Sequence, residues 1–204
     1  MAGLRERKKA LTRQHIADVA AGLFGARGYD EVSILDVARA AEVSDQTVYN
    51  YFPAKQDLVL DRAAEYAERY PSTVRERPAG TSPAAALRGL AREDVERHRR
   101  TKPAQLKGEL PAVSASSPTI RRYALEMRDL HAAAVAAAIV ETTPGIHPAV
   151  ARIHATALMA AFQLIVDHLG RGVLAGTSPE AVADELAPVV EAVFDELDRN
   201  FPRS

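Results

Sequence analysis

The feature that most constrains this chain is a pair of short amphipathic segments joined by a tight turn, within residues 33–55. Ser33 predicts an N-cap, because its hydroxyl can accept a hydrogen bond from a free amide of the first helical turn. Asp36, three residues later, can reach back to complete a capping box. The apolar residues that follow recur at helical spacing on one face: Ile34, Val37, Ala38 and Ala41.

The second segment begins directly after turn residues 41–43. Ser44 predicts its N-cap, and Val48 and Phe52 stack on one side because they are four residues apart. Two helices joined this tightly form a helix-turn-helix, which places its second helix in the major groove of DNA. An ordinary helical hairpin with a solvated face fits the same pattern, and the residues alone leave both interpretations open.

The polar face of the second segment suits the recognition of DNA. The amides of Gln46 and Asn50 can make paired hydrogen bonds to adenine, and the methyl group of Thr47 can contact thymine. Hydroxyl and ammonium groups hold phosphates without reading sequence; the candidates are Ser33, Tyr49, Tyr51 and Lys55. Ser44 and Asp45 complete the predicted DNA-contacting set at the start of this helix.

Residues 43–59, VSDQTVYNYFPAKQDLV, resemble the end of the DNA-binding domain of the TetR family of bacterial repressors. The positions that match the family's spacing are Val43, Ser44, Thr47, Tyr49, Tyr51, Phe52, Lys55 and Leu58, preceded by Phe24, Gly28 and Tyr29. Glu42 is a departure, because the family most often has glycine in this turn. If the turn requires a left-handed backbone, Glu42 costs about 1 kcal/mol there.

The start of the chain is strongly basic. The net charge of the whole chain is −1, but residues 1–13 carry five Lys or Arg residues against Glu6 alone. A basic arm beside a helix-turn-helix predicts contact with phosphates, although a solubilising terminus has the same composition. The resemblance also implies that Thr12 and Arg13 lie near the DNA backbone, while Thr12 fits a local capping role equally well.

The pattern throughout is helical, and no strand-like alternation occurs. Helices are predicted over about residues 8–27, 55–70, 84–101, 104–115, 118–142, 148–174 and 178–200, in addition to the two short ones. Pro71 is expected to end the helix before it, with residues 71–83 as a loop. The prediction is an all-α fold of about nine helices: a three-helix DNA-binding domain over 1–53 and a larger ligand-binding and dimerisation domain over 54–204.

The last two predicted helices are apolar on more than one side, whereas a surface helix of a monomer needs only one apolar stripe. The surplus predicts burial against a second copy, through Ala157, Ala161, Leu164, Ile165, Val189, Val193 and Leu197. A helix central to its own domain is the alternative. The resemblance implies a homodimer, whose two-fold symmetry would match a palindromic operator.

The resemblance also implies a pocket for a small-molecule ligand among the helices of the larger domain. Candidates chosen by periodicity are His98, Tyr123, Met127, His131, His154, Leu158, Phe162 and Gln163, each of which also fits a plain core or surface role. The sequence does not identify the ligand.

Other classes of function find little support. The chain has no cysteine, no glycine-rich phosphate loop and no G-x-S-x-G or H-E-x-x-H motif, so neither an enzyme nor a cofactor is expected. His154 and His168 would lie about 21 Å apart along one helix, too far to share a metal ion. The carboxylate pair Glu93 and Asp94 reads as solvated.

Charged residues interrupt the apolar runs, so no membrane span is expected. The first residues lack the apolar core of a secretory signal, which favours the cytoplasm. The sequence therefore predicts a dimeric DNA-binding regulator, a repressor if it follows the family. The alternative is a helical ligand-binding or interaction protein without a DNA-binding role.

Overall fold

The computed structural model describes the backbone of residues 2–200, and within this range all side chains except those of residues 2, 4, 5 and 62–65. This part of the chain folds into ten α-helices without a strand, which confirms the all-α prediction. The helices are α1 (Ala2–Arg27), α2 (Ile34–Ala40), α3 (Asp45–Tyr51), α4 (Asp57–Arg75), α5 (Pro83–Arg100), α6 (Pro103–Leu106), α7 (Leu110–Ser116), α8 (Pro118–Thr142), α9 (Pro148–Ala175) and α10 (Pro179–Asn200).

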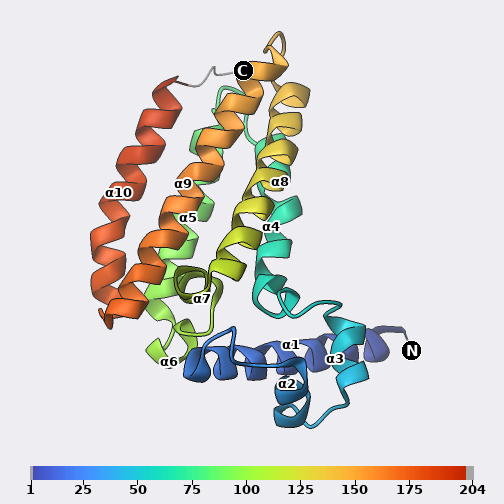
Figure 1. The fold of residues 1–204 in the computed structure, drawn as a ribbon. Helices are drawn as coiled ribbons and strands as arrows, with labels where there is room; N and C mark the ends of the chain where they lie inside the picture. Colours follow the sequence, from blue (N-terminus) through green and yellow to red (C-terminus); the bar gives the residue numbers. More distant parts are fainter. Residues whose placement is uncertain (1, 201–204) are drawn as a thin grey trace.

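The helices form a small unit and a larger bundle (Figure 1). Helices α1–α3 lie at one end, and α4 leads from them into a bundle with α5, α8, α9 and α10. Each part has its own apolar core. The stripe of α1 meets α2 and α3 through Ile16, Val37, Val48 and Phe52, all buried, as in a three-helix DNA-binding unit.

Helix α4 takes part in both cores. Leu58 and Val59 at its start pack in the core of α1–α3, whereas Tyr70 and Val74 further along pack in the core of the bundle. Ile120 at the start of α8 also joins the smaller core. A change in the tilt of α4 would therefore change the packing of both groups of helices.

The prediction that Pro71 ends α4 is wrong, because the helix continues to Arg75. A proline inside a helix removes one hydrogen bond and costs about 3 kcal/mol. Tyr70 and Val74, on either side of Pro71, are almost fully buried in the bundle core. Burying two side chains of this size contributes roughly 3–6 kcal/mol, which exceeds the cost of the proline.

The single helix predicted over 104–115 is two helices, α6 and α7, which raises the total to ten over residues 2–200. Gly108 lies in the turn between them, pressed against α1. A Cβ atom added to Gly108 would lie only 1.8 Å from the carbonyl oxygen of Ala21. Pro111 stands in the first turn of α7, where its missing N–H leaves no hydrogen bond unmade.

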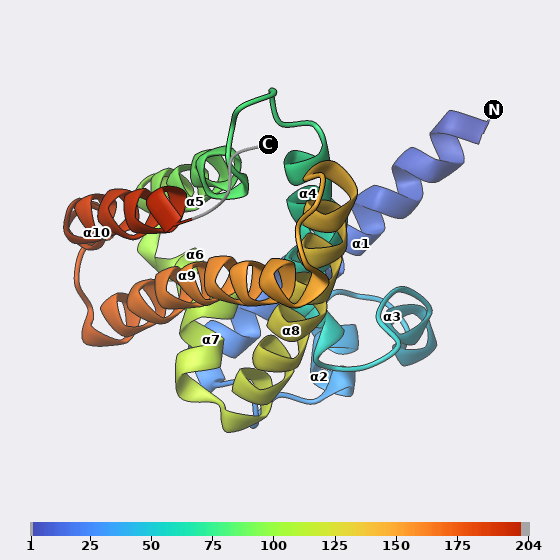
Figure 2. The same ribbon diagram turned by 90° about the horizontal axis from the view of Figure 1, so that it is seen from above.

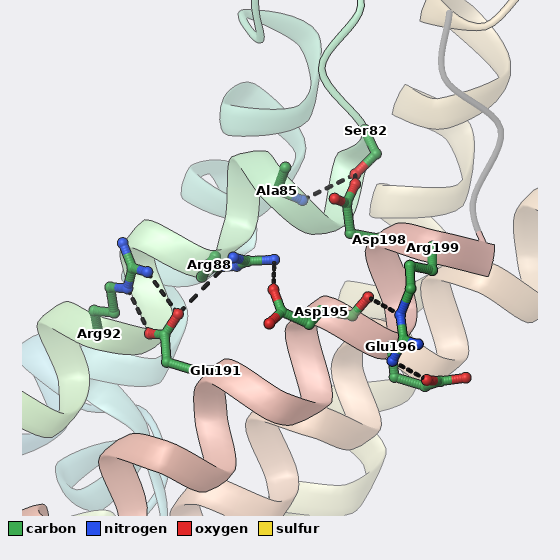
Figure 3. Close-up of polar contacts among 9 residues, drawn as sticks. All are labelled: Ser82, Ala85, Arg88, Arg92, Glu191, Asp195, Glu196, Asp198 and Arg199. Carbon is green, nitrogen blue, oxygen red and sulfur yellow. Dashed lines mark hydrogen bonds and ion pairs between the residues drawn. The ribbon is translucent and has the colours of Figure 1, made fainter.

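Helices α5 and α10 are joined by a ladder of polar contacts (Figure 3). Arg92 donates two hydrogen bonds of 2.6 Å to the carboxylate of Glu191, and Arg88 pairs with Asp195 at 2.8 Å. At the other end of the ladder the Ser82 hydroxyl donates to Asp198 and accepts from the amide of Ala85. This ladder covers one side of α10, so another side remains available for a partner.

Helix α9 is apolar enough to be a candidate membrane span, although the sequence led us to expect none. By length and composition alone, α9 could cross a membrane. The helix packs against α7, α8 and α10, and Leu158, Ile165 and Leu169 are almost fully buried in the bundle core. A central helix of a helical bundle passes the same compositional test, so the composition of α9 is weak grounds for a membrane span.

Candidate nucleic-acid interface

Local hydrogen bonds fix the starts of α2 and α3. Ser33 caps α2 in a capping box with Asp36, and these hydrogen bonds lower the pKa of the Asp36 carboxyl. Ser44 caps α3 by accepting from the amide of Thr47 at 3.1 Å. Between the two helices Glu42 has φ of +56°, which is the left-handed conformation that the glycine comparison anticipated.

The free face of α3 carries the polar residues predicted to contact DNA. Asp45, Gln46, Tyr49 and Asn50 are exposed, while Val48 on the opposite side is fully buried. The Gln46 amide donates to the Asn50 side-chain oxygen at 3.2 Å, so these two amides lie side by side. The face can therefore present adjacent donors and acceptors to base edges.

Four hydroxyls of the predicted set are already engaged within the protein, including the caps Ser44 and Ser33, whose hydroxyl donates to the Asp36 carboxylate at 2.7 Å. The Thr47 hydroxyl lies 2.8 Å from the Ser44 hydroxyl, so the methyl group is the part of Thr47 that can contact a base. The Thr12 hydroxyl donates to the carbonyl of Lys8 at 3.0 Å, the local arrangement that the sequence left open.

Arg13 joins three helices. Its guanidinium donates to the backbone carbonyl of Tyr51 at 2.6 Å and to the carboxylate of Asp61, on α4, at 3.0 Å from Nε. Its guanidinium carbon also lies 4.4 Å from the ring centroid of Phe52. Arg13 thus fixes the end of α3 relative to α1 and α4, a role that the sequence did not indicate.

Lys55 lies in the turn before α4, against the ring of Tyr29. Its ammonium nitrogen is 4.1 Å from the ring centroid, and burial lowers the pKa of Lys55. Desolvation, followed by the charge of Asp30, raises the pKa of Tyr29 to about 12. The aromatic contact fixes the direction of the ammonium group, whose donors can still serve a phosphate.

The basic arm is helical, because α1 begins at Ala2 and not near Lys8 as predicted. Figure 2 shows the first part of α1 extending away from the body of the molecule. Arg7, Lys8 and Lys9 are exposed along it. Arg39 is a further exposed cation, in the last turn of α2, that the sequence analysis missed.

The residues proposed for a ligand pocket do not all meet. His131, Leu158 and Phe162 are buried in the bundle core, where Tyr70 contacts both His131 and Phe162, with ring centroids 5.4 and 4.6 Å apart. Tyr123 is half-buried near Tyr29, at the smaller core, and its charge contributes to the raised pKa of Tyr29. The remaining candidates are half-buried Met127, half-buried His154, buried His98, and Gln163, which donates to Asp167 at 2.8 Å.

The bundle also holds a polar cluster that the sequence analysis misread as solvated. The Tyr66 hydroxyl donates to the carboxylate of Asp94, and burial raises the pKa of both groups. Arg97, one turn further along α5, pairs with Glu109 at 2.7 Å. The side-chain nitrogens Nε2 of His98 and His131 are buried without a hydrogen-bond partner. The unsatisfied nitrogen of His131, whose ring contacts that of Tyr70, is one that a polar ligand could satisfy.

Part of the predicted dimer surface is exposed. Leu164 on α9 and Val189 on α10 are 39% and 38% exposed. Ile153 on α9, outside the predicted set, is 69% exposed. Ala161 and Ile165, in contrast, are buried in the core of the chain itself, because they point from α9 into the bundle. The half-buried members of the predicted set are Ala157, Val193 and Leu197.

Comparison with known proteins agrees with this architecture. The sequence model described as "Bacterial regulatory proteins, tetR family" matches residues 16–61, which contain the helix-turn-helix. The regulator TcmR of Streptomyces glaucescens is 31% identical over 144 residues, covering 71% of this chain and 54% of TcmR. This chain belongs to the TetR family. It spans about half the length of TcmR. The TetR family is a family of regulators rather than enzymes.

Solved structures show that TetR-family proteins share this fold along its length. NalD of Pseudomonas aeruginosa, a secondary repressor of a multidrug efflux pump, is 18% identical, with a TM-score of 0.56 over 97% of this chain and 99% of NalD. FadR of Bacillus subtilis, solved with stearoyl-CoA, is 16% identical, with a TM-score of 0.55 over 91% of this chain and 97% of FadR. At these identities the likeness concerns the fold.

Proposed function

We propose that this TetR-family chain is a cytoplasmic transcriptional repressor that binds a palindromic DNA operator as a homodimer and is released by a small molecule. The observation that carries the proposal is the free face of α3. It presents the adjacent amides of Gln46 and Asn50 on a helix whose cap and buried side fix its orientation.

In this proposal the residues divide into readers and anchors. Gln46, Asn50 and the Thr47 methyl group contact base edges. Tyr49, Tyr51 and Lys55 hold phosphates, whereas the donors of Ser33 are occupied by Asp36. The cations of the α1 arm and Arg39 add sequence-independent attraction. Residues 1–53 form the DNA-binding domain, although its core also takes in Leu58 and Val59 of α4.

The homodimer would form through α9 and α10 of each chain as a four-helix bundle. The support is the exposed apolar face that includes Ile153, Leu164 and Val189, while α5 covers another side of α10. A two-fold axis through these helices would set the two copies of α3 about one turn of DNA apart, as a palindrome requires.

The ligand would enter the bundle between α4, α5, α8 and α9, around Tyr66, Tyr70, Asp94 and His131. The stearoyl-CoA complex of FadR supports a ligand within this fold. Because α4 carries Tyr70 in the bundle and also Asp61, which pairs with Arg13, a ligand that shifts α4 would move the end of α3. The change in operator affinity cannot exceed the ligand's differential affinity for the two states.

Selection of bound duplexes from a random DNA pool tests the proposal. The natural protein should enrich a palindrome, and a Gln46→Ala/Asn50→Ala variant should not enrich the same sequence. Unchanged circular dichroism of the variant would show that it is folded. If the natural protein, folded and dimeric, enriches no sequence, the alternative of a helical ligand-binding or interaction protein without a DNA-binding role replaces this one.

A further inference from the structure

A cleft of about 490 Å³ opens between the end of α5, helix α6 and the connection from α9 to α10. It lies outside the polar cluster around Tyr66 and Asp94. Figure 1 places α6 at the opposite end of α1 from α3, so the cleft is also far from the proposed base-reading face. Neither proposed site accounts for the residues that line it.

The lining of the cleft is strongly cationic. Arg99, Arg100, Lys102 and Lys107 face one carboxylate, Glu180. Arg99 is held by Glu96 at 3.1 Å and Asp184 at 2.8 Å, and Arg100 pairs with Glu96 at 3.8 Å. Lys102 and Lys107, in contrast, are exposed and have no ion-pair partner among the described residues. Two lysines without a carboxylate partner therefore line one hollow, and their mutual repulsion makes the arrangement more favourable with an anion bound.

The cleft also offers donors that are not cationic. Thr177 lines it and adjoins Ser178, which caps α10 by accepting from the amide of Ala181 at 3.2 Å, whereas the Thr101 hydroxyl already donates to the carbonyl of Arg97 at 2.7 Å. The positive end of the dipole of α10, a helix of 22 residues, therefore faces the same hollow. Hydroxyls, guanidinium groups and ammonium groups together suit a ligand with several charged oxygens, such as a phosphate ester.

One cation of the cleft is attached to the DNA-binding unit. Lys107 precedes Gly108, whose backbone lies against Ala21 of α1, and a Cβ atom on Gly25 of α1 would lie 3.0 Å from the Cβ of Lys107. The backbone of Lys107 thus rests on α1, and residue 107 also lines the cleft. A ligand that draws the Lys107 side chain inward would act directly on α1.

We propose that this cleft is a second effector site, which binds a small phosphate-bearing anion and changes the affinity of the protein for DNA through the contact of residues 107–108 with α1. Binding of the anion stands on the cleft alone, whereas its effect on DNA rests on the proposed function.

Calorimetric titration of the full chain with sodium pyrophosphate, at constant ionic strength set with sodium chloride, tests the site. The Lys102→Ala/Lys107→Ala variant should bind roughly a hundredfold more weakly, since each of the two lost charge-assisted hydrogen bonds removes about a factor of ten. Glu180→Gln should bind about threefold more tightly, because it removes the only carboxylate of the lining. The matched control, Arg122→Ala/Arg128→Ala on α8, removes two charges elsewhere and should bind normally.

Absence of pyrophosphate binding, or equal weakening in the α8 control, would overturn the site. The effect is tested by DNA binding with and without pyrophosphate, in the natural protein and in Lys102→Ala/Lys107→Ala. A change in DNA affinity that only the natural protein shows supports the effector role, and an identical response of both proteins overturns it. If neither protein binds DNA in any condition, the proposed function fails while the calorimetric result still decides the site.

Discussion

Replacing Glu42 by glycine should make the protein more stable. Glu42 has φ of +56°, and an L-residue in this left-handed region costs roughly 1–2 kcal/mol, which glycine avoids. Glycine also loosens the unfolded chain, which offsets about 0.4–1 kcal/mol of the gain. The expected net increase in the free energy of unfolding is about 0.5–1 kcal/mol, or a rise of about 1–4 °C in Tm.

Urea denaturation followed by far-UV circular dichroism measures this gain, with Glu42→Ala as the matched control. Alanine removes the exposed carboxylate but keeps a Cβ atom, so it retains the backbone strain and should leave the stability nearly unchanged. The difference between the two variants isolates the backbone contribution. If Glu42→Gly is no more stable than Glu42→Ala, the turn is not strained by its side chain and the reasoning fails.

Three further predictions concern the packing of the larger domain. Gly108→Ala should lower the free energy of unfolding by about 1–3 kcal/mol or more in the same urea assay, because its Cβ would collide with the backbone of Ala21. The control Gly89→Ala, in an open part of α5, should raise the free energy of unfolding by up to about 1 kcal/mol. An unchanged stability of Gly108→Ala would contradict the close approach of the two backbones. Burial lowers the pKa of His131, so the contribution of this neutral imidazole to stability is present above the unfolded pKa of about 6.5 and is lost as the pH falls towards the lower folded pKa. The free energy of unfolding should therefore decline less from pH 7 to pH 5 in His131→Phe than in the natural protein. An equal decline in both proteins would refute the role of His131. Leu164→Glu/Val189→Glu should be monomeric by light scattering, while Leu130→Glu, on α8 and 70% exposed, should stay dimeric. A dimeric double variant would place the interface elsewhere.

The helix-turn-helix was predictable from the sequence because its determinants are local. Ser33 and Asp36 form the capping box that their spacing indicated, and Ser44 caps α3 as expected. Even the strain at Glu42 could be anticipated, because the backbone of a three-residue turn between two helices has few alternatives.

Features that depend on contacts between distant segments could not be read from the sequence. Proline propensity alone ends α4 at Pro71, but burial of Tyr70 and Val74 in the bundle keeps the helix intact. Asp94 reads as a solvated carboxylate on α5, and only the packing of α4 brings the Tyr66 hydroxyl to it. Arg13 likewise meets Asp61 across 48 positions of chain.

The predicted ligand and dimer residues illustrate a limit of periodicity. A helical stripe indicates which residues share a face, but it does not state whether that face meets the bundle core or a second copy. Leu164 and Ile165 were predicted together for the dimer surface, yet Leu164 is 39% exposed and Ile165 only 2%. Adjacent residues on a helix point about 100° apart, so only the position of the neighbouring helices separates them.

The central claim is that α3 reads bases while the groups around it hold phosphates. The most direct measurement is the affinity of the natural protein, Gln46→Ala and Lys55→Ala for the selected operator and for each of its single-base variants, at several salt concentrations. Gln46→Ala should lose about 1–3 kcal/mol of discrimination at one position of each half-site, whereas Lys55→Ala should weaken binding to every sequence and reduce the salt slope by about one. A uniform loss on all sequences for Gln46→Ala would contradict the account.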